Sequence, residues 1–161
     1  MIDLNVKAPV ALIDYSLSFM KSGAKIMNIA SCAGFQPIPY INDYASTKAF
    51  LLSYSRALNK ELKYKNIHVL AVTPYWTKTE FFDRAVDEDK KKVVINYNAM
   101  YDAKDVMTKA IRDLYNPNKD ISCYGFMNNF QKILTKILPH KLVMKIWMGQ
   151  QKLDGTPDIR K

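Results

Sequence analysis

"AKIMNIASCAGFQPIPYINDYASTK", residues 24–48, is the stretch that decides the fold of this chain. It opens with a short, largely apolar run, residues 24–30, which lies between Gly23 and the small-residue segment 31–34. A run of this length and composition is typical of a strand that is buried on both faces of a sheet. A loop with two prolines and then a helical pattern follow it, so the stretch predicts a strand-loop-helix unit.

The rest of the chain continues this alternation. The expected helices cover 3–21, 42–64, 102–115 and 127–150 (the last broken at Pro139), and the expected strands cover 24–30, 66–74 and 120–126. Asn42 or Asp43 is expected to cap the second helix. Strands that alternate with helices of this length indicate a parallel sheet with right-handed crossovers. We therefore predict an α/β fold, with a doubly wound parallel sheet of about three strands and flanking helices, as a single domain over 1–150 and a polar tail over 151–161.

Cysteine and histidine usage exclude several classes of protein. Cys32 and Cys123 lie far apart without CxxC spacing, which favours a reducing, cytoplasmic compartment. Because His68 and His140 are the only histidines, we expect no metal site. The formal net charge is +9, but the basic residues are scattered and no nucleic-acid-reading motif is present. We therefore expect a solvated basic surface and no nucleic acid partner.

Three polar residues, Ser31, Tyr44 and Lys48, follow the first strand and open the next helix. Ligands of open parallel sheets bind beyond the carboxyl ends of the strands, which is where this order places them. Tyr44 and Lys48 are one helical turn apart, so the ammonium is expected to lower the pKa of the phenol. The Ser31 hydroxyl could orient a substrate oxygen. The three residues therefore predict an acid/base site for carbonyl–alcohol interconversion, with the hydride supplied by a cofactor.

The YxxxK spacing alone occurs by chance in many helices, so its context matters. "NIASCAG", residues 28–34, resembles the strand-end serine motif of the short-chain dehydrogenase/reductase family, and "YASTK", residues 44–48, resembles its catalytic YxxxK. "VTPYWTKTEF", residues 72–81, is similar to the proline-led motif that follows the next strand in that family. Asn5 stands where the family places an asparagine in the preceding helix. The resemblance extends over residues 1 to about 125 and more loosely to 150.

The resemblance implies a role for each of these residues. Tyr44 would be the catalytic acid/base, Lys48 would lower its pKa and bind the nicotinamide ribose, and Ser31 would orient the substrate oxygen. Asn5 would hold a water molecule of a proton relay. The residues that would contact the nicotinamide end of an NAD or NADP cofactor are Tyr44, Lys48, Pro74, Tyr75, Trp76, Thr77 and Thr79. Tyr75 departs from the family, which has a glycine after the proline, and its Cβ restricts φ.

The Gly-rich TGxxxGxG turn of the family has no counterpart among the five glycines of the chain. In the family, the backbone amides of that turn bind the cofactor pyrophosphate at a helix N-terminus. The resemblance therefore implies a partial Rossmann-type sheet, the C-terminal portion of a family member without its N-terminal cofactor-binding half. The strand at 24–30, which is interior in the family, would then have an unpaired edge here. We expect such a truncated chain to be inactive by itself.

Two functions remain open. The first is an NAD(P)-dependent oxidoreductase that interconverts a small-molecule carbonyl and an alcohol. The aromatic residues Trp76, Phe81, Phe82 and Tyr97 favour an apolar substrate such as an acyl chain or a steroid. The second is a non-catalytic fragment that acts as a dimerisation or assembly module.

The resemblance also implies a homo-oligomer, because in the family the helices that correspond to 3–21 and 42–64 commonly pair with their counterparts. A further alternative is association with a membrane surface through "KILTKILPHKLVMKIWMGQQK", residues 132–152, where apolar residues alternate with lysines. Core packing or a substrate lid explains the same pattern, and we favour that interpretation.

Overall fold

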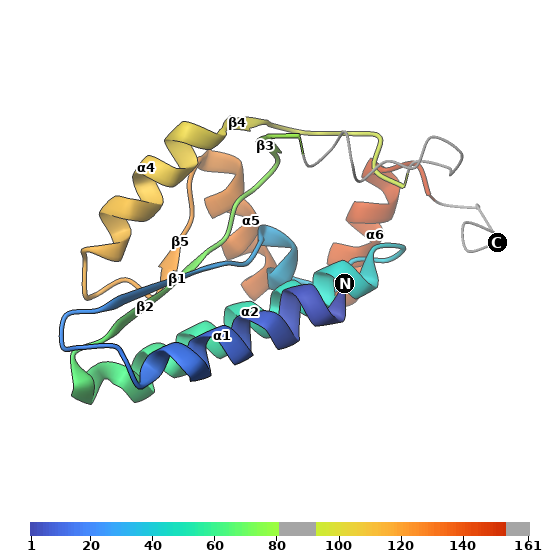
Figure 1. The fold of residues 1–161 in the computed structure, drawn as a ribbon. Helices are drawn as coiled ribbons and strands as arrows, with labels where there is room; N and C mark the ends of the chain where they lie inside the picture. The colour runs from blue at the N-terminus through green and yellow to red at the C-terminus, as the bar shows by residue number, and fades with distance from the viewer. Residues whose placement is uncertain (81–92, 154–161) are drawn as a thin grey trace.

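The computed structural model describes residues 1–80 and 93–153. The elements in chain order are η1 (Asp3–Lys7), α1 (Ala8–Leu17), β1 (Lys25–Ile29), η2 (Cys32–Phe35), α2 (Asn42–Glu61), η3 (Leu62–Lys65), β2 (His68–Val72), β3 (Thr77–Lys78), β4 (Tyr101–Asp102), α4 (Ala103–Leu114), β5 (Ile121–Ser122), α5 (Phe126–Ile137) and α6 (His140–Gln150) (Figure 1). β1, β2 and β5 form a three-stranded sheet in that order, and both pairings are parallel. The α/β class and the parallel sheet of three strands are therefore confirmed.

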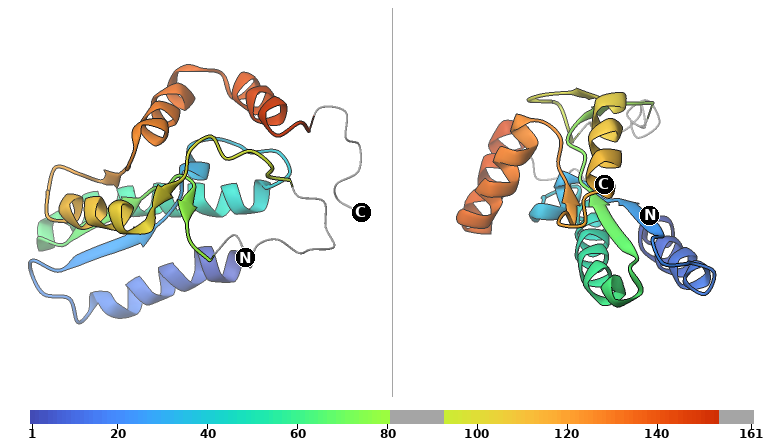
Figure 2. Two further views of the ribbon diagram at one scale, coloured as in Figure 1. Left: turned by 90° about the horizontal axis from the view of Figure 1, so that it is seen from above. Right: turned by 90° about the vertical axis from the view of Figure 1, so that its left-hand side faces the viewer.

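Strand β2 is the centre of the sheet because its side chains are apolar on both faces. Val69 packs with residues of β1, α2 and η3 in one core cluster. Leu70 and Val72 point the other way and pack against Ala110 of α4. Helices α1 and α2 thus cover one face of the sheet and α4 covers the other (Figures 1 and 2). This is the doubly wound arrangement that the alternation of strands and helices predicted.

Strand β1 is only partly buried, so the expectation of burial on both faces is wrong. Ile26 and Asn28 are buried, whereas Lys25 and Ile29 are exposed. The reason is that β1 pairs with β2 alone within the described residues, which leaves it at the edge of the sheet. Asn28 is accommodated inside because its amide donates to the Ser55 hydroxyl at 2.9 Å.

Two helix boundaries differ from the prediction. The first helix ends at Leu17 rather than near residue 21, and the hydroxyl of Ser16 donates to a carbonyl of the preceding turn. Such local bonds compete with helix propagation. Helix α2 begins at Asn42 with Ile41 as its N-cap and no side-chain capping bond, so the expected cap by Asn42 or Asp43 is wrong. Asp43 instead lies in the first turn, where its charge suits the helix dipole.

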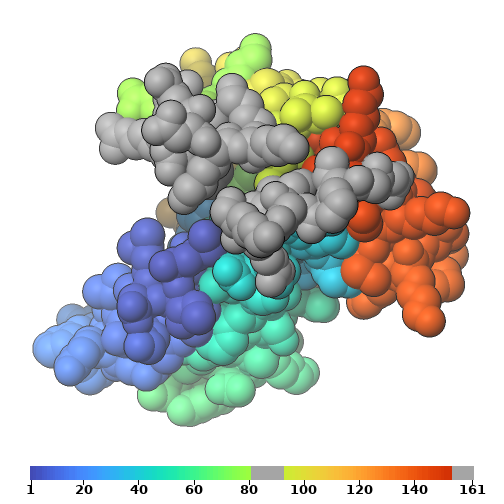
Figure 3. Space-filling view, turned by 90° about the vertical axis from the view of Figure 1, so that its right-hand side faces the viewer, coloured from blue at the N-terminus to red at the C-terminus, as the bar shows by residue number. Residues whose placement is uncertain are grey.

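The C-terminal helices α5 and α6 are separate, as the proline at 139 predicted. They lie on the opposite flank of the molecule from α1 (Figures 2 and 3). Residues 151–153 differ from the expected polar tail, because Gln151 and Leu153 are buried. The Gln151 amide oxygen accepts from the backbone N–H groups of Ile95 and Asn96 at 2.8 and 3.0 Å.

Residues 154–161 of the expected tail lie outside the described residues, as do Phe81 and Phe82. Trp76 and Tyr97, the other two aromatic residues predicted to cover a substrate, pack edge to face with their ring centroids 5.1 Å apart. No helix in the part of the chain that the structure describes has the length and apolar character needed to cross a membrane.

Candidate active site

The carboxyl ends of the three strands meet at one edge of the sheet. Ser31 and Cys32 follow β1, and the backbone N–H of Cys32 donates to the carbonyl of Pro74, after β2, at 3.0 Å. The N–H of Thr73 in turn donates to the carbonyl of Ser122 in β5 at 2.9 Å. These bonds hold the strand ends together, so the residues that follow them form one continuous surface.

Ser31 and Tyr44, which the sequence predicted to cooperate, lie near each other, and hydrogen bonding by the Ser31 side chain acts to lower the pKa of the Tyr44 phenol. Ser31 is buried and begins the short helix η2, where its hydroxyl oxygen accepts from the N–H of Ala33 at 3.1 Å. Gly34 allows η2 to lie directly on α2. A Cβ at that position would stand 2.8 Å from the carbonyl oxygen of Lys48, which is too close for any side chain.

Lys48 completes this arrangement. Its ammonium donates to the carbonyl of Ile29 at 2.9 Å and lies 5.7 Å from the centroid of the Tyr44 ring. Ser31, Tyr44 and Lys48 therefore lie together at the end of β1, as the spacing predicted.

The expected lowering of the Tyr44 pKa is wrong for this structure. Burial of the phenol raises the pKa of Tyr44, and this effect is larger than the opposing effect of the hydrogen bond with Ser31. Burial likewise lowers the pKa of Lys48, because the charged ammonium is partly desolvated. Tyr44 is therefore a neutral phenol at neutral pH.

Asn5 is connected to the turn of α2 that carries Tyr44. Its amide donates to the hydroxyl of Thr47 at 3.3 Å, and that hydroxyl donates to the carbonyl of Tyr44 at 2.8 Å. Asn5 lies in the π-helical segment η1, a local geometry that is frequent at functional sites. Asn5 and Lys48 also line a common pocket of about 290 Å³ beside β1. The role of Asn5 in a water relay stays a prediction.

Within the segment from Pro74 to Thr79, the first residues have contacts near the predicted site. Trp76 and Tyr44 pack against the same cluster, which is built around Ala45 and Trp147. The backbone of Tyr75 has a negative φ, so the side chain that replaces the family's glycine causes no left-handed strain. Thr77 lies in β3 and its hydroxyl donates to the carbonyl of Tyr75 at 2.9 Å.

Thr79 is exposed, and its hydroxyl donates to the carbonyl of Thr77 at 3.5 Å. The cofactor contacts assigned to Thr77 and Thr79 stay predictions.

Two residues near the site were missed in the sequence. The indole N–H of Trp147 donates to the carbonyl of Pro39 at 3.2 Å, and the amide of Asn128 donates to the carbonyl of Thr73 at 2.6 Å. These pairs are 108 and 55 residues apart in the sequence, so no local pattern could have indicated them. Burial raises the pKa of the Cys32 thiol, adjacent to Ser31, to about 12, which favours the neutral thiol over the thiolate at neutral pH.

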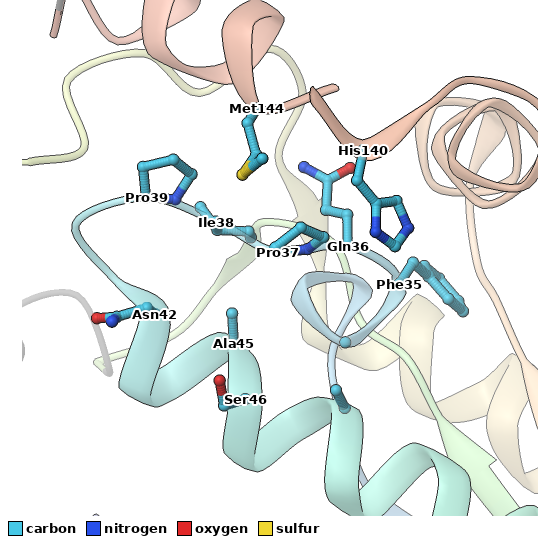
Figure 4. Close-up of a pocket in the computed structure, with 12 residues that line it drawn as sticks. Phe35, Gln36, Pro37, Ile38, Pro39, Asn42, Ala45, Ser46, His140 and Met144 are labelled. Carbon is cyan, nitrogen blue, oxygen red and sulfur yellow. The ribbon is translucent and has the colours of Figure 1, made fainter. Parts of the chain in front are cut away.

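A larger pocket, of about 480 Å³, lies on another side of α2 (Figure 4). Asn42, Ala45 and Ser46 of α2 line it, together with the loop 34–39 and two residues of α6, His140 and Met144. Neither Ser31 nor Tyr44 nor Lys48 is part of this lining, so this pocket is distinct from the predicted site. Among residues 1–80 and 93–153, no group of three or more His, Cys, Asp or Glu side chains could hold a metal ion.

The chain is similar to curated oxidoreductases. It is 40% identical over 76 residues to an uncharacterized oxidoreductase, YghA, of Escherichia coli, a match that covers 46% of this chain and 26% of that protein. It is 37% identical over 82 residues to a very-long-chain 3-oxoacyl-CoA reductase of Danio rerio, covering 50% of this chain and 26% of the reductase. The matches thus span about a quarter of the length of these relatives.

Solved structures share the fold. A short chain dehydrogenase from Burkholderia cenocepacia, crystallised in complex with NADP, superposes with a TM-score of 0.71. The two sequences are 14% identical, and the superposition covers 93% of this chain and 58% of the dehydrogenase. A 7beta-hydroxysteroid dehydrogenase superposes with a TM-score of 0.69 at 16% identity, over 91% of this chain and 56% of the other. At these identities, the likeness concerns the fold.

The family model for short chain dehydrogenases matches residues 1–90 of the 161. The matched segment contains Asn5, Ser31, Tyr44 and Lys48, as well as the loop from Pro74 to Thr79. Because the model covers more than half of the chain, the resemblance seen in the sequence is confirmed: this chain belongs to the short-chain dehydrogenase/reductase family.

Proposed function

We propose that this chain provides the acid/base site of an NAD(P)-dependent oxidoreductase that reduces a carbonyl to an alcohol. The observation that carries the proposal is the position of Lys48 at the carboxyl end of β1, where its ammonium donates to the carbonyl of Ile29 at 2.9 Å and lies 5.7 Å from the centroid of the Tyr44 ring. A neutral phenol beside a hydroxyl donor is suited to protonate a developing alkoxide. Because burial raises the pKa of Tyr44, the phenol keeps its proton at neutral pH and has one to give.

Each side chain contributes a separate step. The Ser31 hydroxyl donates a hydrogen bond to the substrate carbonyl and holds it beside Tyr44. The Tyr44 hydroxyl gives its proton to that oxygen as negative charge develops on it, which leaves a phenolate. The Lys48 ammonium, close to the ring, stabilises the phenolate electrostatically. Asn5, through Thr47, holds the turn that carries Tyr44 in place.

The residues present fit the nicotinamide end of an NAD or NADP cofactor, which supplies the hydride when bound. Lys48 is half-buried in the pocket beside β1, with its ammonium available to a ribose hydroxyl. The loop that begins at Pro74 is bonded to the chain after β1, which places its backbone at the same edge of the sheet. The NADP bound to the Burkholderia structure supports this class of cofactor.

The substrate that we propose has an apolar body. The aromatic side chains of Trp76 and Tyr97, which pack together, and the apolar cluster around Trp147 adjoin Tyr44. The Danio rerio relative is named for a very-long-chain 3-oxoacyl-CoA, and a 17-beta-hydroxysteroid dehydrogenase type 3 of Rattus norvegicus is 35% identical over 80 residues. Both names support a ketone on an extended apolar skeleton.

A direct test joins this chain to the segment of YghA that precedes its match, because the 161 residues contain no Gly-rich pyrophosphate turn. We expect this chimeric protein to oxidise NADPH or NADH in the presence of apolar ketones. A chimeric protein that is folded and binds cofactor, but reduces no carbonyl compound in a panel of acyl and steroid ketones, would contradict the proposal.

Cofactor binding by the chain alone is a second test. The groups at the nicotinamide end supply a few hydrogen bonds of about 0.5–1.5 kcal/mol each, against an association cost of at least roughly 4 kcal/mol. We therefore expect a dissociation constant on the order of millimolar or weaker when NADPH fluorescence is followed. Low micromolar affinity would show that the cofactor needs no pyrophosphate turn here.

A non-catalytic assembly module is the second candidate, and the surface of α1 supports it. Leu4, Leu12, Tyr15 and Phe19 recur at helical spacing and are exposed. Charges of both signs accompany them, namely Asp3, Lys7 and Asp14. An apolar stripe with mixed charges suits a second copy of the chain. Sedimentation equilibrium of the chain and of a Leu12→Ser/Phe19→Ser variant tests this, and a dimer that the variant still forms would exclude α1 as its interface.

A further inference from the structure

Helix α5 turns its apolar side toward solvent. Phe126, Phe130, Ile133 and Ile137 lie at positions i, i+4, i+7 and i+11, which places them on one face of the helix. Their side chains are exposed by 79%, 48%, 55% and 73%. The opposite face is buried, and there the helix carries the polar side chains of Asn128 and Thr135. An amphipathic helix at the surface of a globular protein normally has the reverse arrangement.

The stripe on α5 is therefore not explained by core packing, so the core-packing interpretation of 132–152 is wrong for this helix, whereas the substrate lid stays a prediction. Core packing is correct for α6, where Val143 and Trp147 are buried. The rings of Phe126 and Phe130 stack on each other with centroids 6.2 Å apart, so they form a continuous apolar surface. Helix α6 adds Leu142 and Ile146, both exposed, to the apolar surface of the helix pair.

The charges around this stripe have one sign. The segment 126–153 contains no Asp or Glu, and its five lysines are Lys132, Lys136, Lys141, Lys145 and Lys152. The stripe on α1 differs, because acidic and basic residues alternate along it. An anionic lipid bilayer has negatively charged head groups above an apolar interior. The apolar stripe suits that interior, and the lysines suit the head groups.

We propose that α5 and α6 dock this protein on an anionic membrane surface. Helix α5 lies in the plane of the interface, with Phe126, Phe130, Ile133 and Ile137 below the head groups and the exposed Lys136 at their level. The helix pair forms one flank of the molecule, so a flat surface can approach it without meeting α1 (Figure 3). An apolar substrate that dissolves in lipid would then be delivered near the enzyme.

Flotation of the full chain with vesicles tests the proposal. We expect binding to vesicles of phosphatidylcholine with phosphatidylserine, and much weaker binding to pure phosphatidylcholine. The Phe126→Ser/Ile137→Ser variant should bind at least tenfold more weakly. The matched control, Leu12→Ser/Phe19→Ser, removes two similarly exposed apolar side chains (67% and 84%), one in α1 and one just after its end, and should bind like the parent chain.

A second pair of variants separates docking from general attraction of a basic protein. In the Lys136→Gln/Lys141→Gln variant, which changes two exposed lysines of the segment, each lost charge should weaken binding by about fivefold. Lys63→Gln/Lys65→Gln, at exposed positions of η3, removes the same charge elsewhere and should have a smaller effect. Equal losses for the two pairs would overturn the proposal.

Two other results would also overturn it. One is the absence of binding to phosphatidylserine vesicles. The other is self-association of the chain that the Phe126→Ser/Ile137→Ser variant abolishes without any vesicle binding, since the stripe would then be covered by a second copy. Circular dichroism of each variant verifies that the fold is kept, which the exposure of these side chains leads us to expect.

Discussion

The two sides of helix α2 carry different kinds of side chain and line pockets of different volume. One side carries Tyr44, near Ser31, and Lys48, whose ammonium donates to the carbonyl of Ile29. The other side lines the larger pocket, of about 480 Å³, where its side chains are short, as at Ala45. The larger pocket is therefore not the one beside the predicted acid/base residues, because Lys48 lines the smaller pocket, of about 290 Å³.

The loop between η2 and α2 explains why the larger pocket exists. It contains two prolines, Pro37 and Pro39, which cannot donate backbone hydrogen bonds to the helix. The indole of Trp147 holds the carbonyl of Pro39, which keeps the loop against α6. The pocket thus forms where the loop 34–39, α2 and α6 meet, and its lining presents few charged groups.

The largest difference between the two sides is expected from Tyr44→Phe. Loss of the phenolic proton should reduce carbonyl reduction by the chimeric protein by about 10²–10⁴-fold, because general acid catalysis contributes that much. Stability should fall by only about 0.5–1.5 kcal/mol, the value of one hydrogen bond. Steady-state kinetics and urea denaturation measure the two effects.

The matched control is Tyr54→Phe, which removes a hydroxyl from the same helix, where the ring stacks on Phe50 at 5.8 Å. It should leave turnover unchanged. Near-normal turnover by the Tyr44 variant would remove the chemical distinction between the two sides of α2.

Gly34→Ala should have the next largest effect, because Gly34 lies against the backbone of Lys48 and also lines the larger pocket. The new Cβ would stand 2.8 and 2.9 Å from the carbonyl oxygen and carbon of Lys48, so η2 and α2 must separate. We expect a destabilisation of about 1–3 kcal/mol, measured by thermal unfolding, and reduced turnover of the chimeric protein.

Gly23→Ala is the control for Gly34→Ala, since a Cβ at residue 23 meets no atom within 4 Å. Its φ of +89° still makes the substitution unfavourable, so stability falls, but turnover should not. If both variants left turnover unchanged, close contact between η2 and Lys48 would not matter for the site.

The pH dependence of stability should include a contribution from the burial of Tyr44 and Lys48. The folded-state pKa of Tyr44 is raised above the value of about 10 in the unfolded chain. Its contribution to stability is therefore complete below pH ~10 and is lost as pH rises through the folded-state pKa. Lys48 has the opposite sign, because its folded-state pKa is lowered, so that stability rises with pH up to about pH 10.4.

Urea denaturation of the parent chain and of Tyr44→Phe at alkaline pH measures these contributions. The parent should lose more stability than the variant above pH ~10. Identical pH profiles would mean that the Tyr44 phenol is as well solvated as a free tyrosine.

Much of the site could be predicted from the sequence because its parts are close along the chain. Ser31, Tyr44 and Lys48 fall within one strand-loop-helix unit, where strand ends and helical spacing fix their places. The pKa of Tyr44 could not be predicted in the same way. Sequence spacing indicates which charged side chains are near Tyr44. The burial of the Tyr44 phenol depends instead on residues that are far away in the sequence, such as Trp76 and Trp147 of the same cluster.

The same reasoning applies to the fold. The apolar run of β2 predicted a buried strand correctly, because helices cover both faces of the sheet there. β1 looked similar in composition, and its position at the edge of the sheet was predicted from the family resemblance and not from its own residues. The apolar periodicity of α5 predicted a helix correctly and its buried face wrongly, since periodicity alone does not say which side is covered.

The smallest effect is expected on the pocket side of α2, from Ser46→Ala. Ser46 is exposed, lies two residues after Tyr44 and lines the larger pocket, so the substitution deletes one hydroxyl as Tyr44→Phe does, but from the other side of the helix. Stability should change by no more than about 0.5 kcal/mol, slightly in favour of alanine, which has the higher helix propensity. Turnover of the chimeric protein should stay the same, because no proton passes through this pocket. A loss of tenfold or more in turnover would mean that the pocket belongs to the reaction site, and the two sides of α2 would then have to be treated as one.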